Sequence, residues 1–197
     1  MKSALVIGCS ANVWEDLKAA KALATYDAIY CVKQVGIYYP DSFDVWVTLH
    51  PEAMDKYEME RSLLELPNGY EIVAPPKHEL SVDHAKKGNI SRRVPYRWPE
   101  QQTNASASSG LYGAKVALHD GFDKIVLAGI PMTADAGHFL PESKNTLGAV
   151  RGKVWTGHAA FVSGMNESIP RFMGKVKSMS GYTKQVLGEP TPEWFRA

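Results

Sequence analysis

The stretch 108–132, SSGLYGAKVALHDGFDKIVLAGIPM, predicts one α-helix followed by one buried β-strand. Ser108 is placed to cap the helix, because its hydroxyl can accept a hydrogen bond from an unpaired amide of the first turn. Apolar residues then recur at helical spacing, and Gly121 suits the position after the helix, where positive φ favours glycine. The run 125–130, IVLAGI, is apolar on both faces, as in a central parallel strand. Pro131 cannot continue the hydrogen-bond ladder, so we expect the strand to end there.

The N-terminal residues predict a second unit of similar design. Residues 4–7, ALVI, indicate a short buried strand, and residues 8–12, GCSAN, indicate a tight turn. Residues 13–26 place apolar side chains on one face and acids in the first turn, which is typical of a helix. Strand, glycine turn and helix are the usual opening of a doubly wound sheet. Further strands are expected at 27–32, 44–49, 70–73 and 175–179, helices at 51–66, 155–173, 183–187 and 192–195, and a loop at 36–41.

Together these elements predict an α/β fold, a Rossmann-like three-layer sandwich with a mostly parallel sheet, as a single domain over residues 1–197. The 197 residues can bury one sizeable core, and the hydrophobic fraction of 45% is typical of globular proteins. Two polar stretches, at about 75–107 and 133–154, are expected to form long loops. Loops of such length in a compact domain are usually functional or mobile.

Charge and cysteine content exclude several classes of protein. The 22 basic and 21 acidic residues give a net charge of +1, which provides no strong signal for nucleic-acid binding. Cys9 and Cys31 are too few for a disulfide scaffold or a thiolate zinc site, so we expect free thiols in the cytoplasm of a bacterial or phage-infected cell. No segment reaches the ~20 apolar residues that span a bilayer. No metal-ligand spacing stands out, and homo-oligomerisation stays open.

Candidate binding residues follow from the expected strand ends. In parallel α/β sheets, ligands bind beyond the carboxyl ends of the strands. The helix that begins after Ser108 also offers free amides and a positive dipole end to an anion. The candidate ligand-binding residues are Gly8, Ser10, Asn12, His50, Arg97, Ser108, Ser109, Gly110, Pro131 and Met132.

Basic and aromatic residues cluster in the first long loop, at Arg92, Arg93, Tyr96, Arg97 and Trp98. This mixture suits a negatively charged or aromatic ligand, so we expect the loop to close over a nucleotide and neutralise its charge. A solvated flap or an oligomer contact is the alternative interpretation.

Two histidines are candidate catalytic groups. His138 lies in the loop after the central strand, where catalytic groups are often carried, and is the candidate general base. His158, at the start of the following helix, is the second candidate, with a structural role as the alternative. Ser108 and Ser109 are expected to cap the helix or contact phosphate, because no GxSxG elbow follows a strand.

Two segments carry a resemblance to known families: 6–20, VIGCSANVWEDLKAA, and 108–132. They resemble the family 42 sialyltransferases and the MptE-like proteins of flagellin glycosylation. The resemblance implies a Rossmann-like sheet that binds a cytidine nucleotide or a pyrophosphoryl donor. It implies nucleotide contacts at Gly8, Ser10, Asn12, Ser108, Ser109 and Gly110, and a histidine base at His138 or His158. A longer resemblance, including 44–52, DVWVTLHPE, and 177–195, KSMSGYTKQVLGEPTPEWF, is to uncharacterised phage and prophage proteins of the "norphogenetic" type.

The leading hypothesis is a protein that binds a nucleotide or nucleotide sugar of the CMP or UDP type and transfers a glycosyl group. Ala11 and Pro131 depart from the family pattern of Gly-Pro-Ser and Gly-Ile-Asp. They motivate the alternative, a non-catalytic phage assembly or host-effector protein that meets its partner through aromatic residues near Trp98 or Trp194. A nucleotide hydrolase or phosphotransferase would use the same site as the transferase.

Overall fold

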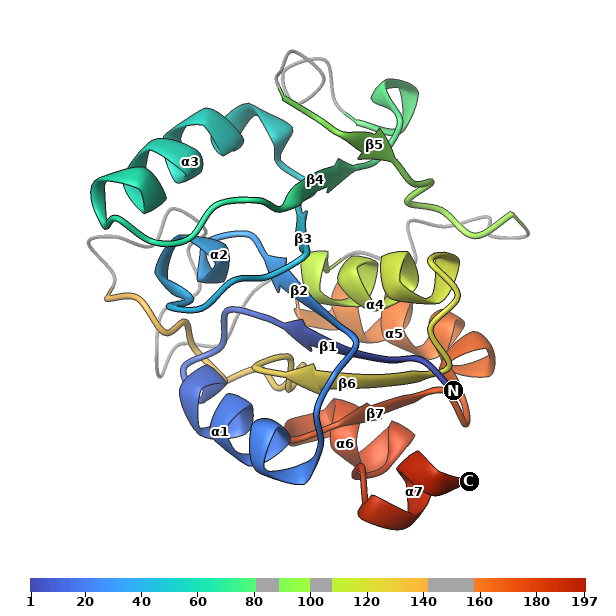
Figure 1. Ribbon diagram of the computed structural model, residues 1–197. Helices are drawn as coiled ribbons and strands as arrows, with labels where there is room; N and C mark the ends of the chain where they lie inside the picture. The colour runs from blue at the N-terminus through green and yellow to red at the C-terminus, as the bar shows by residue number, and fades with distance from the viewer. Residues whose placement is uncertain (81–88, 100–107, 142–157) are drawn as a thin grey trace.

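The computed structural model describes residues 1–80, 89–99, 108–141 and 158–197. Its centre is a seven-stranded sheet in the order β5-β4-β3-β2-β1-β6-β7, and every neighbouring pair of strands is parallel (Figure 1). The strands are β1 Ser3–Ile7, β2 Ala28–Val32, β3 Val45–Val47, β4 Glu71–Ala74, β5 Arg92–Arg93, β6 Lys124–Ala128 and β7 Val176–Ser178. The chain adds strands in one direction from β1 to β5 and then returns to place β6 beside β1. Ligands of doubly wound folds bind at such a reversal.

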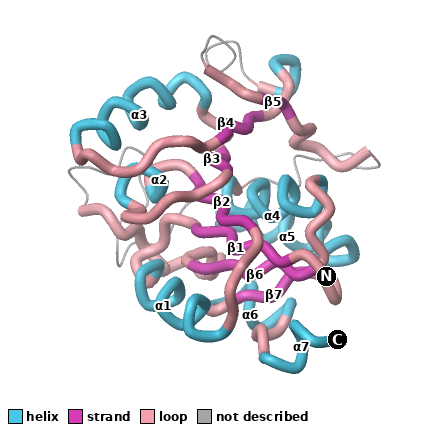
Figure 2. The backbone as a smooth tube through the Cα atoms, in the orientation of Figure 1, coloured by secondary structure: helices cyan, strands magenta, loops and turns pink. Residues whose placement is uncertain are grey.

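Helices cover both faces of the sheet, and the strands lie between them (Figure 2). The helices are α1 Val13–Leu23, α2 Val35–Tyr38, α3 Met54–Leu63, α4 Ser109–His119, α5 His158–Phe172, α6 Gly181–Leu187 and α7 Pro192–Arg196, with 3-10 turns η1 Pro51–Ala53 and η2 Lys77–Glu79. The described residues form two hydrophobic cores, one on each face of the sheet, and alternate side chains of β1 belong to one or the other. Leu5 and Ile7 pack with α1, α2 and α3, whereas Ala4 and Val6 pack with α4, α5 and α6. The predicted three-layer, Rossmann-like fold is therefore confirmed, with a wholly parallel sheet.

The helix and strand predicted at 108–132 are present, with one boundary moved. Ser108 caps α4, since its hydroxyl accepts from the Leu111 amide at 3.1 Å. Gly121 follows the helix with a φ of +83°. The strand β6 ends at Ala128 and not at Pro131, because Gly129 already adopts a left-handed φ of +67°.

Other boundaries also differ from the sequence-based expectations. The expected loop at 36–41 contains α2, and the expected helix at 51–66 divides into η1 and α3. The first long loop contains an edge strand, β5, that the sequence does not predict. Its two residues are both arginine and so show no alternation of apolar and polar side chains. Pro170 lies in the last turn of α5 without interrupting it. Much of both long loops, and the expected helix start at 155–157, lies outside the described residues.

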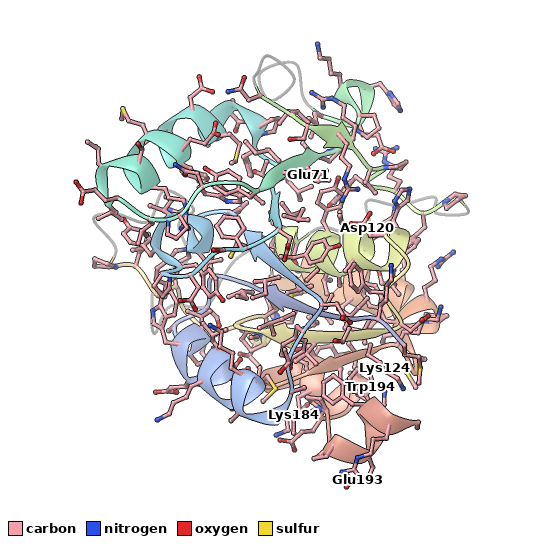
Figure 3. The ribbon with its side chains drawn as sticks, viewed as in Figure 1. Glu71, Asp120, Lys124, Lys184, Glu193 and Trp194 are labelled. Carbon is pink, nitrogen blue, oxygen red and sulfur yellow. The ribbon has the colours of Figure 1, made fainter. Side chains whose placement is uncertain are left out.

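The C-terminal helix α7 docks against the start of β6 and the turn before β7. The Trp194 indole nitrogen donates to the Gly174 carbonyl at 3.1 Å. The Lys124 ammonium lies 4.9 Å from the centroid of a Trp194 ring, and both residues are labelled in Figure 3. Trp194 is thus half-buried within the fold.

Candidate functional site

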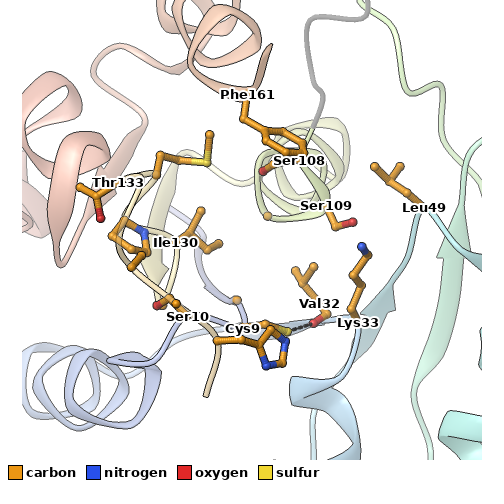
Figure 4. Close-up of a pocket in the computed structure, with 18 of the residues that line it drawn as sticks. Cys9, Ser10, Val32, Lys33, Leu49, Ser108, Ser109, Ile130, Thr133 and Phe161 are labelled. Atoms are coloured by element: carbon orange, nitrogen blue, oxygen red, sulfur yellow. Dashed lines mark hydrogen bonds between the residues drawn. The ribbon is translucent and has the colours of Figure 1, made fainter. Parts of the chain in front are cut away.

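A cavity of about 320 Å³ lies at the carboxyl edge of the sheet, where the strand order reverses. Its walls come from the ends of β1, β2, β3 and β6, the start of α4, and the segment after β6 (Figure 4). Most of the predicted site residues line it: Gly8, Ser10, His50, Ser108, Ser109, Gly110, Pro131, Met132 and His138. Its size and position are typical of a small-molecule site.

The start of α4 forms one wall of the cavity. The Ser108 hydroxyl accepts a hydrogen bond from the Leu111 amide. The backbone amides of Ser109 and Gly110, in the first turn, have no acceptor within the helix. The buried Ser109 hydroxyl has no hydrogen-bond partner among the described residues. A side chain at Gly110 would place Cβ 2.8 Å from Ile130, so this approach requires glycine. Free amides and the helix dipole favour an anion here.

Lys33, which the sequence analysis missed, points into the same space. It directly follows β2 and has a left-handed φ of +53°. Its carbonyl accepts from the Trp46 indole at 2.6 Å, and its amide donates to the Val47 carbonyl at 3.0 Å. Figure 4 shows its ammonium and the Ser109 hydroxyl directed toward one another. Burial lowers the pKa of Lys33, and no ion pair to it forms within the described ranges. Its position directly after a strand end is the signal that could have identified it.

His138 is buried and presents a hydrogen-bond donor. Its Nδ1 accepts from the Leu140 amide at 3.0 Å, so the hydrogen of the neutral ring lies on Nε2. That Nε2 has no partner in the part of the chain that the structure describes. Burial, together with the nearby charge of Lys33, lowers the pKa of His138 to about 4. The geometry therefore favours a neutral donor, where the sequence analysis expected a general base.

His50 enters the cavity from the end of β3 with a carboxylate beside it. Its amide donates to the Thr48 hydroxyl at 2.8 Å, which fixes the turn. Its Nδ1 lies 2.9 Å from Oε1 of Glu52, in the first turn of η1. The cavity thus holds two histidines with different partners.

The turn after β1 uses its polar groups inside the fold. The Gly8 amide donates to the Ala128 carbonyl at 2.8 Å, and the Ser10 amide donates to the Gly129 carbonyl at 3.2 Å. The Ser10 hydroxyl donates to the side-chain oxygen of Asn12, which does not line the cavity. These groups therefore already have partners within the fold, and a phosphate contact from them would have to compete with these hydrogen bonds.

Asp16 of α1 completes this internal network. Its carboxylate accepts from the Gly129 amide at 2.8 Å and from the Ser180 hydroxyl at 2.6 Å. The side-chain amide of Asn12 donates to the Asp16 carboxylate at 3.2 Å and to the Ser180 hydroxyl at 2.8 Å. Burial raises the pKa of Asp16 despite these bonds. The network joins α1, the end of β6 and the start of α6, and so supports the floor of the cavity.

The arginines of the first long loop do not line the cavity. Arg92 donates to both carboxylate oxygens of Asp120, at 2.9 and 2.6 Å, and to Glu71 at 2.8 Å. Figure 3 labels the two acidic residues. Asp120 lies at the C-terminal end of α4, whereas the cavity lies at its N-terminal end. Arg93 donates to the Pro75 carbonyl. Neither arginine lines the cavity, and Arg92 is held by Asp120 and Glu71, so the described contacts do not support the expected closure of this loop over a ligand.

Arg97 and the neighbouring Trp98 belong to a different contact. The Arg97 carbonyl accepts from the Lys115 ammonium at 2.5 Å, and its side chain is exposed. The Lys115 ammonium and the Arg171 guanidinium each lie over Trp98, at 4.4 and 4.9 Å from a ring centroid, and Trp98 meets Phe172 edge-on. Trp98 is half-buried over α4 and α5, where a protein partner would not meet its whole face.

His158 begins α5 outside the cavity. Its Nε2 lies 3.0 Å from the Met132 carbonyl, which ties α5 to the segment that lines the cavity. The side chain borders a separate, open depression along α5. This placement favours the structural role over the catalytic one.

The described residues offer no metal centre. No aspartate or glutamate lines the cavity, and no cluster of three or more potential ligands occurs within the described ranges. Cys9 and Cys31 are free, as predicted. The Cys9 thiol donates to the Val32 carbonyl at 3.1 Å, and burial raises its pKa to about 11. In the same ranges, no helix has the length and apolar character needed to cross a bilayer.

Comparison with known proteins adds one structural likeness. No family model matches the chain, and no curated protein matches its sequence. Among solved structures, the fold is similar to the sialyltransferase CST-II, determined in complex with a trisaccharide acceptor and CMP. The TM-score is 0.62 at 11% identity, over 97% of this chain and 87% of that chain. The likeness to a family 42 sialyltransferase thus holds for the fold, whereas the phage and MptE-like resemblances find no support.

Proposed function

We propose that the cavity binds a nucleotide or nucleotide sugar of the CMP or UDP type, with its phosphate at the start of α4, as the donor for glycosyl transfer. The observation that supports this proposal most is that the cavity holds hydrogen-bond donors and one ammonium group but none of the described carboxylates. Lys33, Ser109 and His138 line the cavity together with the first amides of α4, and none of the described carboxylates lines it. Such a set suits a phosphate oxygen, which accepts hydrogen bonds and carries negative charge.

The rest of the cavity supports an organic ligand larger than phosphate. Apolar side chains of Leu49, Ile130 and Phe161 form much of the wall (Figure 4). Ligand sites commonly combine such a wall with a few placed polar groups. The fold likeness to a sialyltransferase solved with CMP supports a nucleotide as that ligand.

Calorimetric titration with CMP, UMP, a CMP-linked sugar and a UDP-linked sugar tests this proposal. We expect Lys33→Met and Ser109→Ala each to weaken binding roughly tenfold, because each removes a charge-assisted hydrogen bond. The exposed Lys18→Met and Ser62→Ala variants are matched controls and should bind as the parent does. If the parent protein binds none of these compounds while it is folded, the proposal is wrong.

A non-catalytic nucleotide-binding protein is the second candidate. It is favoured by the donor tautomer of His138, which leaves the expected base without a lone pair directed at a substrate. Release of CMP or UDP from the bound sugar nucleotide separates the two candidates. With water as the acceptor, the products would identify a hydrolase that uses the same cavity.

A further inference from the structure

Lys33 brings a primary amine into the cavity. Its ammonium and the Ser109 hydroxyl point toward one another (Figure 4), and no aspartate or glutamate of the described residues lines the cavity. Its backbone is fixed directly after β2, because its carbonyl accepts from the Trp46 indole and its amide donates to the Val47 carbonyl. Burial lowers the pKa of Lys33, so more of this side chain is the uncharged amine at neutral pH than in an exposed lysine. An uncharged amine in apolar surroundings is a nucleophile toward a carbonyl carbon.

The start of α4 provides an anion site beside this amine. Ser109 is 8% exposed, and its hydroxyl has no partner among the described residues. The backbone amides of Ser109 and Gly110 have no acceptor within the helix. Together with the positive end of the helix dipole, these donors favour a phosphate group. A ligand whose phosphate binds here can place a carbonyl carbon next to the amine, because the Lys33 side chain faces Ser109.

His138 adds a neutral hydrogen-bond donor to the same cavity. Its Nδ1 accepts from the Leu140 amide, so the ring hydrogen lies on Nε2, which has no partner among the described residues. The pKa of His138 lies near 4, so the ring is uncharged at pH 7. The charge of Lys33 contributes to this low pKa, which places the two side chains close together. An uncharged ring can polarise a carbonyl group by hydrogen bonding without repelling a positive charge on Lys33.

We propose that Lys33 forms an imine with a small phosphorylated aldehyde or ketone, whose phosphate binds at the start of α4 and whose carbonyl oxygen accepts from Nε2 of His138. The nitrogen of the uncharged amine forms a bond to the carbonyl carbon, and a proton of the amine moves to the oxygen, giving a carbinolamine. The hydroxyl then takes one further proton and leaves as water, and the nitrogen–carbon double bond forms as an iminium. Overall, the ammonium form of Lys33 and the carbonyl compound give an iminium and one water, so no oxidant or reductant is needed. This activity goes beyond the proposed function and needs no nucleotide.

The charged groups around Lys33 suit an iminium. The iminium keeps the positive charge of the lysine, so it stays attracted to the bound phosphate. Glu52 of η1 attracts the same charge and raises the pKa of Lys33, which opposes the effect of burial. The Cys9 thiol, whose pKa lies near 11, is uncharged at pH 7, as is His138. The phosphate therefore stabilises the covalent product as well as the initial complex.

Reductive trapping with pyridoxal 5′-phosphate, a phosphorylated aldehyde, tests the inference. Sodium borohydride reduces the imine to a secondary amine, and mass spectrometry of the peptides locates it. We expect at least about tenfold more modification at Lys33 than at the exposed Lys18 at neutral pH. Pyridoxal, which lacks the phosphate, should lose most of this preference. Equal modification of the two lysines, or the same preference with pyridoxal, would overturn the proposal.

Variants separate the amine from the anion site beside it. Lys33→Arg keeps the positive charge but cannot form an imine, so modification at this position should vanish. Ser109→Ala should lower the modification of Lys33 about tenfold with pyridoxal 5′-phosphate and less than about twofold with pyridoxal. The exposed Ser62→Ala variant is the matched control, and thermal unfolding of each variant shows that the fold is retained. A loss of equal size with both aldehydes would mean that Ser109 acts through packing, and it would overturn the phosphate contact.

Calorimetric titration with CMP separates this inference from the proposed function. Binding of CMP together with protection of Lys33 from pyridoxal 5′-phosphate would support both and place them in one cavity. Selective modification of Lys33 in a protein that binds no nucleotide would overturn the proposed function and support the imine. Nucleotide binding without selective modification of Lys33 would overturn the imine proposal alone.

Discussion

Arg61 holds one region of the protein together through hydrogen bonds to backbone carbonyls. It is fully buried on α3, and its guanidinium donates to the carbonyls of Gly36, Tyr39, Asp41 and Pro67 at 2.6 to 3.2 Å. These carbonyls belong to the chain segments on either side of β3. The pattern of apolar residues along the chain does not indicate this role, because the partners are backbone atoms up to 25 residues away.

We expect Arg61→Met to destabilise the protein by at least about 3 kcal/mol, because it leaves several buried carbonyls without donors. For a chain of this size that loss should lower Tm by roughly 6–12 °C. Differential scanning calorimetry measures it, with the exposed Arg196→Met as the control. Equal Tm values for the two variants would contradict the role of Arg61.

At the scale of elements, the rule that ligands bind at the carboxyl ends of parallel strands correctly predicts the place of the cavity. The ends of β1, β3 and β6 and the start of α4 all line it. The same rule applies to β2 and identifies Lys33, which no glycine turn marks in the sequence. The prediction for the arginine loop is not supported, for a different reason. Arg92 is fixed by Asp120, 28 residues away, and local composition does not report such a long-range pair.

The junction of β6 with the cavity gives a prediction for this scale. Gly129 and Gly121 both have left-handed φ values, but a Cβ at Gly129 would lie 2.6 Å from Val13, whereas that of Gly121 would meet open space. We expect Gly121→Ala to cost about 1 kcal/mol from conformation alone. Gly129→Ala should cost clearly more, because α1 must shift. Urea denaturation of both variants measures the difference in the free energy of unfolding. Similar losses of stability in the two variants would show that α1 can shift without a cost in free energy.

For the whole molecule, the stability in acid should depend on His138. Its pKa is lowered from 6.5 to about 4 in the folded protein, mainly by burial. The unfolded chain therefore binds more protons than the folded chain between these values, and stability falls as the pH falls from about 6.5 toward 4. The full effect is on the order of 3 kcal/mol. Asp16, whose pKa is raised by burial, acts in the opposite direction, because its folded state binds the proton more readily at low pH.

His138→Gln should therefore flatten the loss of stability between pH 6.5 and pH 4, because a glutamine takes up no proton. Asp16→Asn should leave the slope contributed by His138 in place. Urea denaturation at a series of pH values measures both slopes. A His138→Gln variant with the same acid slope as the parent would mean that the ring leaves the cavity wall when it is protonated. A bound phosphate should reduce the slope in the parent, since an imidazolium beside an anion regains the stability that burial removes, and this links the acid behaviour of the whole fold to the proposed ligand.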